Sequence, residues 1–81
     1  MLNSGDKMNT RIRELREDRD LTQTQVAQAI GISQRKYSYL ETGVQQWTDE
    51  QLVKLADFYQ TSVDYLLERT DEKRPYPEKK R

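Results

Sequence analysis

The stretch LTQTQVAQAIGISQRKYSYLETG, residues 21–43, decides the fold, because it contains two short helical patterns joined at a glycine. Thr22 suits the position just before a helix, and Gln25 three residues later completes a capping box. In a capping box each side chain bonds the backbone of the other residue, which fixes the start of the helix. Gly31 marks the end of this first helix, since glycine adopts positive φ without a steric penalty.

The second helix of this stretch is expected over about residues 34–42. Ser33 is its N-cap, and Gly43 lies just after its end. The joint between the two helices is short and contains Gly31, so the helices can cross steeply. Ala27 is small at the point where the two helices approach most closely. Together these features predict a helix-turn-helix.

The second helix has two unlike faces. At about 100° per residue, Tyr37, Leu40 and Glu41 share one side, which we expect to face the core. The opposite side carries hydroxyl groups, an aromatic ring and a cation, and these side chains are expected to face outward. Its members are Arg35, Ser38, Tyr39 and Thr42.

The rest of the chain adds three more helices. Apolar residues at helical spacing predict a helix from about Asn9 to Arg19. Thr48 and Gln51 repeat the capping box before an apolar stripe that ends near Tyr59. Ser62 caps a last short helix. No segment shows the alternation of a strand, so the predicted fold class is all-α with five short helices.

The composition narrows the classes of function. The 81 residues suffice for one domain, with 33% hydrophobic and 35% charged residues. The sequence has no Cys and no His, which excludes a disulfide framework, a thiolate metal site and the commonest catalytic bases. No stretch approaches the roughly 18 apolar residues of a membrane span. No signal peptide is visible at the start. We therefore expect no enzyme activity, no cofactor, no metal, no membrane contact and a cytoplasmic location.

The charges are unevenly distributed, although the formal net charge is zero. Residues 21–40 contain Arg35 and Lys36 and no acid, whereas residues 41–72 contain eight acids and two bases. Residues 73–81 contain five bases and one acid. This pattern is expected if one face must approach an anion while the remaining surface keeps the protein in solution.

These motifs resemble a known family. LTQTQVAQAIGISQRKYSYLETG, followed by LVKLADFYQTSVDYLL, is similar to the lambda-repressor-like helix-turn-helix domains, also called the Cro/C1 or XRE type. The resemblance covers about residues 12–67. It implies a compact five-helix domain and a bacterial or phage transcription regulator, on the nucleoid in the cytoplasm. Turn-forming residues near the start predict a flexible leader over residues 1–7, and two prolines in a run of charges predict a basic, disordered tail over 70–81. The helix-turn-helix DNA-binding domain is then expected over 8–69.

The resemblance also implies how such a domain would bind double-stranded DNA. The helix at about 34–42 would lie in the major groove, because this family reads base edges from that helix. The implied base-contacting residues are Gln34, Arg35, Ser38 and Tyr39. The implied phosphate-contacting residues are Gln23, Lys36, Thr42 and Gln45. A Gln can bond adenine and an Arg can bond guanine in bidentate fashion. The Tyr39 ring could stack on Arg35 or touch a thymine methyl group, and the sequence leaves both open.

Five residues carry the structural motif that the resemblance implies: Arg16, Ala27, Gly31, Glu41 and Gly43. Glu41 is expected to pair with Arg16, because a buried carboxylate needs a partner. The chain departs from the family at the segment VQQW, residues 44–47, where many members carry Lys or Arg. Phosphate contact there would depend on backbone amides and glutamines, which predicts weak binding by a single copy.

Two questions of assembly stay open at the level of sequence. The apolar residues Trp47, Phe58, Tyr59, Tyr65 and Leu67 exceed what one small core needs. They either pack the last two helices together or form a homodimer surface around the last helix. A dimer would suit an operator with an inverted repeat. The alternative function is a protein-interaction module of the same fold, such as an antitoxin or an antirepressor partner. The zero net charge and the neutral VQQW segment favour that alternative.

Overall fold

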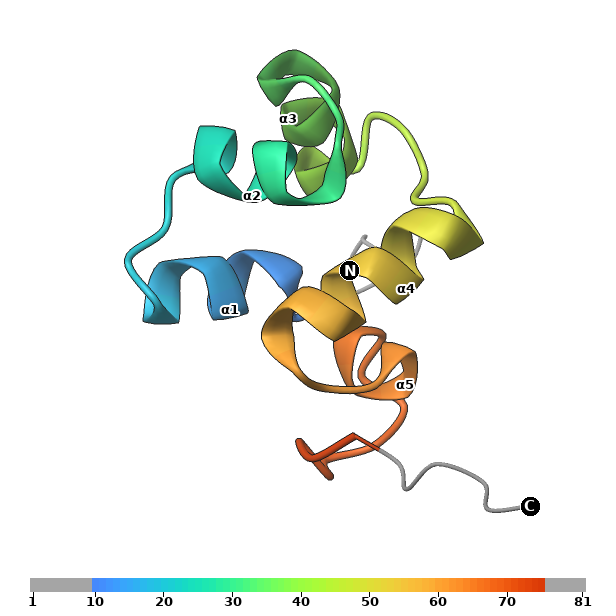
Figure 1. Cartoon of the computed structure of the whole chain (residues 1–81). Helices are drawn as coiled ribbons and strands as arrows, with labels where there is room; N and C mark the ends of the chain where they lie inside the picture. Colours follow the sequence, from blue (N-terminus) through green and yellow to red (C-terminus); the bar gives the residue numbers. More distant parts are fainter. Residues whose placement is uncertain (1–9, 76–81) are drawn as a thin grey trace, which may run out of the picture.

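A computed structural model describes residues 10–75 of the chain. Its regular structure consists of five helices: α1 (Ile12–Asp18), α2 (Gln23–Ile30), α3 (Gln34–Thr42), α4 (Asp49–Tyr59) and α5 (Val63–Leu66). The all-α class and the five helices are thus confirmed. Figure 1 shows α2 and α3 crossing at one end of the molecule, with α5 at the other end. The predicted leader, residues 1–7, and residues 76–81 of the predicted tail lie outside the described residues.

The predicted capping residues begin the helices as expected. The side chain of Thr22 accepts a hydrogen bond from the backbone N–H of Gln25, and the Gln25 side chain accepts one from the backbone N–H of Thr22. Thr48 and Gln51 form the same reciprocal pair at α4. Gly31 ends α2 with φ at 80°. The joint between α2 and α3 therefore has the geometry that the sequence predicts.

The first helix is shorter than predicted. It begins at Ile12 and not near Asn9, because the backbone N–H of Arg11 donates to the carbonyl of Leu66, 2.8 Å away. This bond ties the entry of α1 to the end of α5 instead of to a preceding helical turn. At the other end α1 stops at Asp18, one residue before the predicted Arg19, and Asp20 adopts φ at 56° in the turn that follows.

The core collects side chains from all five helices. Its members are Ile12, Leu15, Val26, Ala27, Ile30, Tyr37, Leu52, Leu55, Ala56, Tyr59 and Leu66. Ala27 is 1% exposed, and its small side chain lets α2 approach its neighbours closely. Trp47 packs edge-on against Tyr37, with 5.6 Å between ring centroids, and covers the core between α3 and α4. Within residues 10–75, no helix is long and apolar enough to cross a bilayer.

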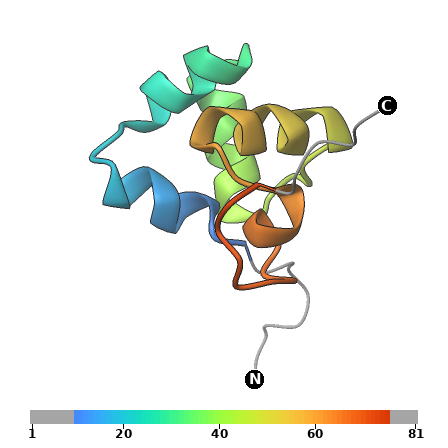
Figure 2. The same ribbon diagram turned by 60° about the horizontal axis from the view of Figure 1, so that its bottom comes forward.

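Residues 70–75, which we call the C-terminal strap, are bonded to the helices. Arg11 donates to the backbone carbonyl of Thr70 at 2.8 Å and pairs with the carboxylate of Asp71 at 2.9 Å. The hydroxyl of Thr61 donates to the carbonyl of Lys73. Figure 2 shows this segment, in red, running back along the helices after α5. The part of the predicted tail that the structure describes is therefore held against the domain.

Candidate nucleic-acid interface

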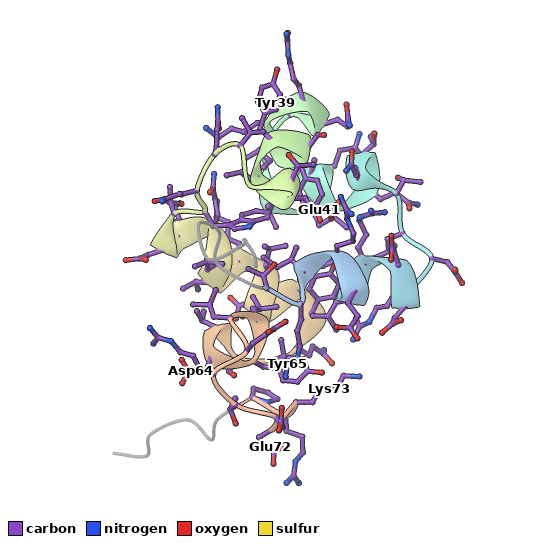
Figure 3. The ribbon with its side chains drawn as sticks, turned by 180° about the vertical axis from the view of Figure 1, so that it is seen from behind. Tyr39, Glu41, Asp64, Tyr65, Glu72 and Lys73 are labelled. Atoms are coloured by element: carbon purple, nitrogen blue, oxygen red, sulfur yellow. The ribbon has the colours of Figure 1, made fainter. Side chains whose placement is uncertain are left out.

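The outward face of α3 presents cations and hydrogen-bonding groups. Arg35, Lys36 and Tyr39 are exposed, while Ser38 is half-buried. Figure 3 shows Tyr39 and Glu41 on opposite sides of α3, as the helical wheel predicts. Neither Arg35 nor Lys36 forms an ion pair with any residue from 10 to 75. Both charges are thus available to an external anion.

Arg35 and Tyr39 lie one helical turn apart and contact each other. The Nε–H of Arg35 donates to the phenolic oxygen of Tyr39 at 3.3 Å. The bond uses Nε of the exposed Arg35, and within residues 10–75 the two Nη groups of Arg35 have no hydrogen-bond partner. A bidentate contact to guanine requires two N–H donors of one guanidinium, and the two Nη groups can supply them. One Nη group together with Nε can also do so if the bond from Nε to Tyr39 breaks.

The first residues of α2 and α3 are joined through their side chains. The amide N–H of Gln34 donates to the carbonyl oxygen of Gln23 at 2.8 Å. The amide N–H of Gln23 in turn donates to Glu41 at 3.0 Å. The structure thus places Gln23, a predicted phosphate contact, where it orients Gln34, a predicted base contact. The carbonyl oxygen of Gln34 and its second N–H remain for a ligand.

Glu41 lies at the centre of a buried network. Its side chain is 1% exposed, and Arg16 pairs with both carboxylate oxygens, at 2.9 and 3.1 Å. The hydroxyl of Tyr37 donates to Glu41 at 2.7 Å. Arg16 also donates to the backbone carbonyl of Leu21 at 2.9 Å. Because Arg16 is on α1, the network fixes α1, α2 and α3 relative to one another.

The hydrogen bonds of this network shift the pKa values of Glu41 and Tyr37. Burial by itself raises the pKa of Glu41, but the hydrogen bonds from Arg16, Tyr37 and Gln23 outweigh it, so the pKa lies below its usual value. Burial and the hydrogen bond to Glu41 raise the pKa of Tyr37. At neutral pH Glu41 is therefore a carboxylate and Tyr37 a neutral donor.

The end of α3 and the segment after it have few free hydrogen-bond donors for a phosphate. Val44 is 70% exposed, and the backbone N–H of Gln45 donates to the carbonyl of Tyr39 at 3.1 Å. The side chain of Gln45 is exposed and can still reach a ligand. The hydroxyl of Thr42 donates a hydrogen bond to the carbonyl of Ser38 at 2.8 Å. To donate to a phosphate, Thr42 would have to break this bond.

Three members of the Glu41 network are not predicted from the sequence as its partners: Gln23, Tyr37 and Arg13. Tyr37 was placed inward only as a core residue, although its position four residues before Glu41 on one helix face allows the bond that forms. Arg13 donates to Glu41 at 3.4 Å. Its position three residues before Arg16 puts both on one face of α1, which was the available signal.

Most of the apolar residues that suggested a dimer surface are packed inside the domain. Tyr59 is 1% exposed, and Tyr65 lies under the guanidinium of Arg11, 4.2 Å from the ring centroid. Phe58 packs edge-on against Tyr59 and stays 37% exposed. Val53, also on α4, is 50% exposed. The exposed apolar side chains near the last helices thus belong to α4.

Acids are kept away from the helix-turn-helix. Residues 21–42 contain one acid, Glu41, and it is buried with its partners. No group of three or more metal-binding side chains occurs anywhere in residues 10–75. The interface therefore combines two exposed cations, a fixed pair of glutamines and the outward side chains of α3.

Comparison with known proteins agrees with this geometry. A family profile described as helix-turn-helix matches residues 12–66, from the start of α1 to the end of α5. The chain belongs to this family. It is of the Cro/C1, or XRE, type that the sequence motifs resemble. No solved structure matches the chain significantly.

Three curated relatives bear names that describe regulation of transcription. YobD of Bacillus subtilis (strain 168), an uncharacterized HTH-type transcriptional regulator, is 40% identical over 70 residues, covering 86% of this chain and 62% of the relative. The cryptic phage CTXphi transcriptional repressor RstR of Vibrio cholerae is 39% identical over 59 residues, covering 73% and 53%. RstR of the V. cholerae El Tor Inaba strain is 41% identical over 68 residues, covering 82% and 61%. The chain thus spans about half to three fifths of the length of these relatives.

Proposed function

We propose that the chain is a sequence-specific DNA-binding transcriptional regulator that acts as a repressor. The observation that carries the proposal is the outward face of α3. There Arg35 and Lys36 form no ion pair with the described residues and lie beside Gln34, which Gln23 holds in place. Membership of the helix-turn-helix family and the repressor names of two relatives support it. In this role the protein works in the cytoplasm, on the nucleoid.

The proposed complex places α3 in the major groove. Gln34, Arg35, Ser38 and Tyr39 contact base edges, because they occupy the outward face and the N-terminal half of α3. Gln23, Lys36, Thr42 and Gln45 contact phosphates on either side of the groove, and these contacts fix the register without reading sequence.

We further propose that two copies bind an inverted repeat. A single copy has few phosphate contacts, since residues 44–47 carry no cation, and a second half-site would restore the affinity. The region of α5 together with the exposed Phe58 and Val53 on α4 is the proposed contact between copies. Sedimentation of the protein alone and on its operator tests this assembly.

The decisive experiment is a fluorescence titration of the protein against two duplexes. One is the intergenic DNA upstream of its own gene, and the other is a scrambled duplex of equal length. Tight, steeply salt-dependent binding to the first duplex alone is expected for a regulator. Equal, weak binding to both would contradict the proposal.

Two substitutions on α3 separate base contact from phosphate contact. Arg35→Ala should weaken binding to the operator by about 1–3 kcal/mol and relax preference at one base position. Lys36→Ala should weaken binding to all sequences alike and lower the salt slope by about one. A uniform loss from Arg35→Ala would contradict its assignment as a base contact.

The second candidate function is a protein-interaction module, such as an antitoxin or an antirepressor partner. The observation that favours it is the neutral segment after α3, where Val44 is 70% exposed. If neither duplex binds specifically, a toxin encoded next to this gene is the first partner to test by co-purification.

A further inference from the structure

We infer that Arg13, on α1, is an additional phosphate-binding residue of the interface. The inference rests on the proposed function and adds to it a contact from outside the helix-turn-helix. Neither the helical wheel of α3 nor the family motif points to this residue. The side-chain contacts around Glu41 do.

Arg13 shares one acceptor atom with Gln23. Its Nε–H donates to Oε1 of Glu41 at 3.4 Å, and the amide N–H of Gln23 donates to the same oxygen at 3.0 Å. Two donors on one oxygen lie within a few ångströms of each other. The guanidinium of Arg13 is therefore next to the first residue of α2, which is the point where the proposed complex meets a phosphate.

Glu41 does not need Arg13. A carboxylate offers about four lone-pair positions, and Arg16, Gln23 and Tyr37 already supply four hydrogen bonds. The bond from Arg13 is a fifth and the longest of the set. Arg16 neutralises the carboxylate within the network, so the charge of Arg13 remains in excess.

The two arginines also differ in exposure. The side chain of Arg13 is 54% exposed, whereas that of Arg16 is 14% exposed. Among residues 10–75, the Nη groups of Arg13 have no bonding partner. A phosphate can thus bind Nη1 or Nη2 while Nε stays on Glu41. The bond to Glu41 then holds the guanidinium in place before DNA arrives.

The position suits an anion for a second reason. The first turn of α2 contains no acid, and its backbone N–H groups carry the positive end of the helix dipole. Arg13, which belongs to α1, adds a full positive charge next to this N-terminal end of α2. This charge replaces in part the cation that many members of the family carry at residues 44–47 and that this chain lacks there.

The test compares Arg13→Gln with Arg69→Gln, which makes the same change of charge elsewhere. Arg69 is 72% exposed and lies 3.9 Å from Asp64. Figure 3 shows Asp64 at the end of the molecule opposite to Tyr39, so Arg69 serves as a matched control away from the interface. Affinity is measured by fluorescence titration on the upstream and scrambled duplexes at four salt concentrations, and melting temperatures are recorded for all variants.

Arg13→Gln should weaken binding to both duplexes by roughly threefold to tenfold and lower the salt slope by about one. Arg69→Gln should leave the affinity and the slope unchanged, and Arg13→Lys should restore most of the slope. The result that overturns the inference is a slope for Arg13→Gln equal to that of Arg69→Gln, whether or not the melting temperature falls. If the unaltered protein binds neither duplex, this result contradicts the proposed function, and with it the inference about Arg13.

Discussion

At the scale of single residues, Glu41 connects the stability of the fold to its interface. Its carboxylate is buried, yet it belongs to the same helix that presents Tyr39 to solvent (Figure 3). Through Gln23 it reaches Gln34, and through Arg16 it reaches α1. A change at Glu41 should therefore alter both the melting of the domain and the orientation of Gln34, the proposed base contact.

The lowered pKa of Glu41 predicts how stability depends on pH. A carboxyl group whose pKa is lower in the folded than in the unfolded state stabilises the fold above its unfolded value of 4.5. This contribution is lost as the pH falls through the folded pKa. We expect the melting temperature to drop on acidification below about pH 4.5.

The variant Glu41→Gln isolates this contribution. It should melt at a lower temperature than the unaltered protein at pH 7 and change less between about pH 5 and pH 3. Thermal melts followed by circular dichroism across this range provide the measurement. Parallel pH profiles for the two proteins would show that other carboxylates dominate the acid transition.

Sequence patterns located Glu41 only in part. Helical periodicity placed it on the inner face of its helix, and the family resemblance supplied Arg16 as its partner. The bond from Gln23 joins α2 to α3 and depends on the distance between the two helices, which periodicity does not encode. The bond from Tyr37 lies within α3, where the spacing of four residues permits it without requiring it. Arg13 has a weak local signal, since it lies three residues before Arg16 on one face of α1, but its bond to Glu41 also depends on the distance between α1 and α3.

At the scale of elements, the starts of α2 through α5 and the ends of α2 and α3 follow from local chemistry. Capping side chains and glycines act within a few residues, so the sequence predicts these boundaries. The start of α1 does not follow, because Arg11 bonds Leu66 across the whole domain. A contact between residues so far apart in the chain leaves no local signal.

The joint between α2 and α3 allows a sharp test. At Gly31 an added Cβ would meet no atom within 4 Å, so the cost of Gly31→Ala comes from its φ of 80° alone. We expect a loss of about 1–2 kcal/mol in the free energy of unfolding, measured with urea. Gly31→Asn should cost less, because Asn tolerates positive φ better. Equal losses from both variants would point to a cause other than backbone conformation.

At the scale of the whole molecule, Arg11 joins the two ends of the described chain. Its guanidinium bonds the carbonyls of Tyr65 and Thr70 and the carboxylate of Asp71, while it covers the Tyr65 ring. The side chain is 17% exposed. Composition alone suggested a solvated tail from residue 70, because charge and proline content do not reveal which carbonyls a distant arginine will reach.

Loss of these bonds should free the C-terminal strap. In Arg11→Gln we expect faster hydrogen exchange in peptides covering residues 70–75, together with a melting temperature a few degrees lower, since several hydrogen bonds of about 1 kcal/mol each are lost. Exchange in α3 should stay unchanged. Arg69→Gln, which keeps the Arg11 contacts, is the control. Unchanged exchange in the strap would contradict this role for Arg11.

The bond network of Arg11 also has a consequence for how the domain can be built into longer proteins. Arg11 and the strap meet beside α5, and α5 lies at the end of the molecule opposite to α2 and α3 (Figure 1). A further domain joined directly to Arg11 or to the strap would start from this same side. It would start away from α3, so an extension on either segment would leave the proposed DNA-binding face of this helix open.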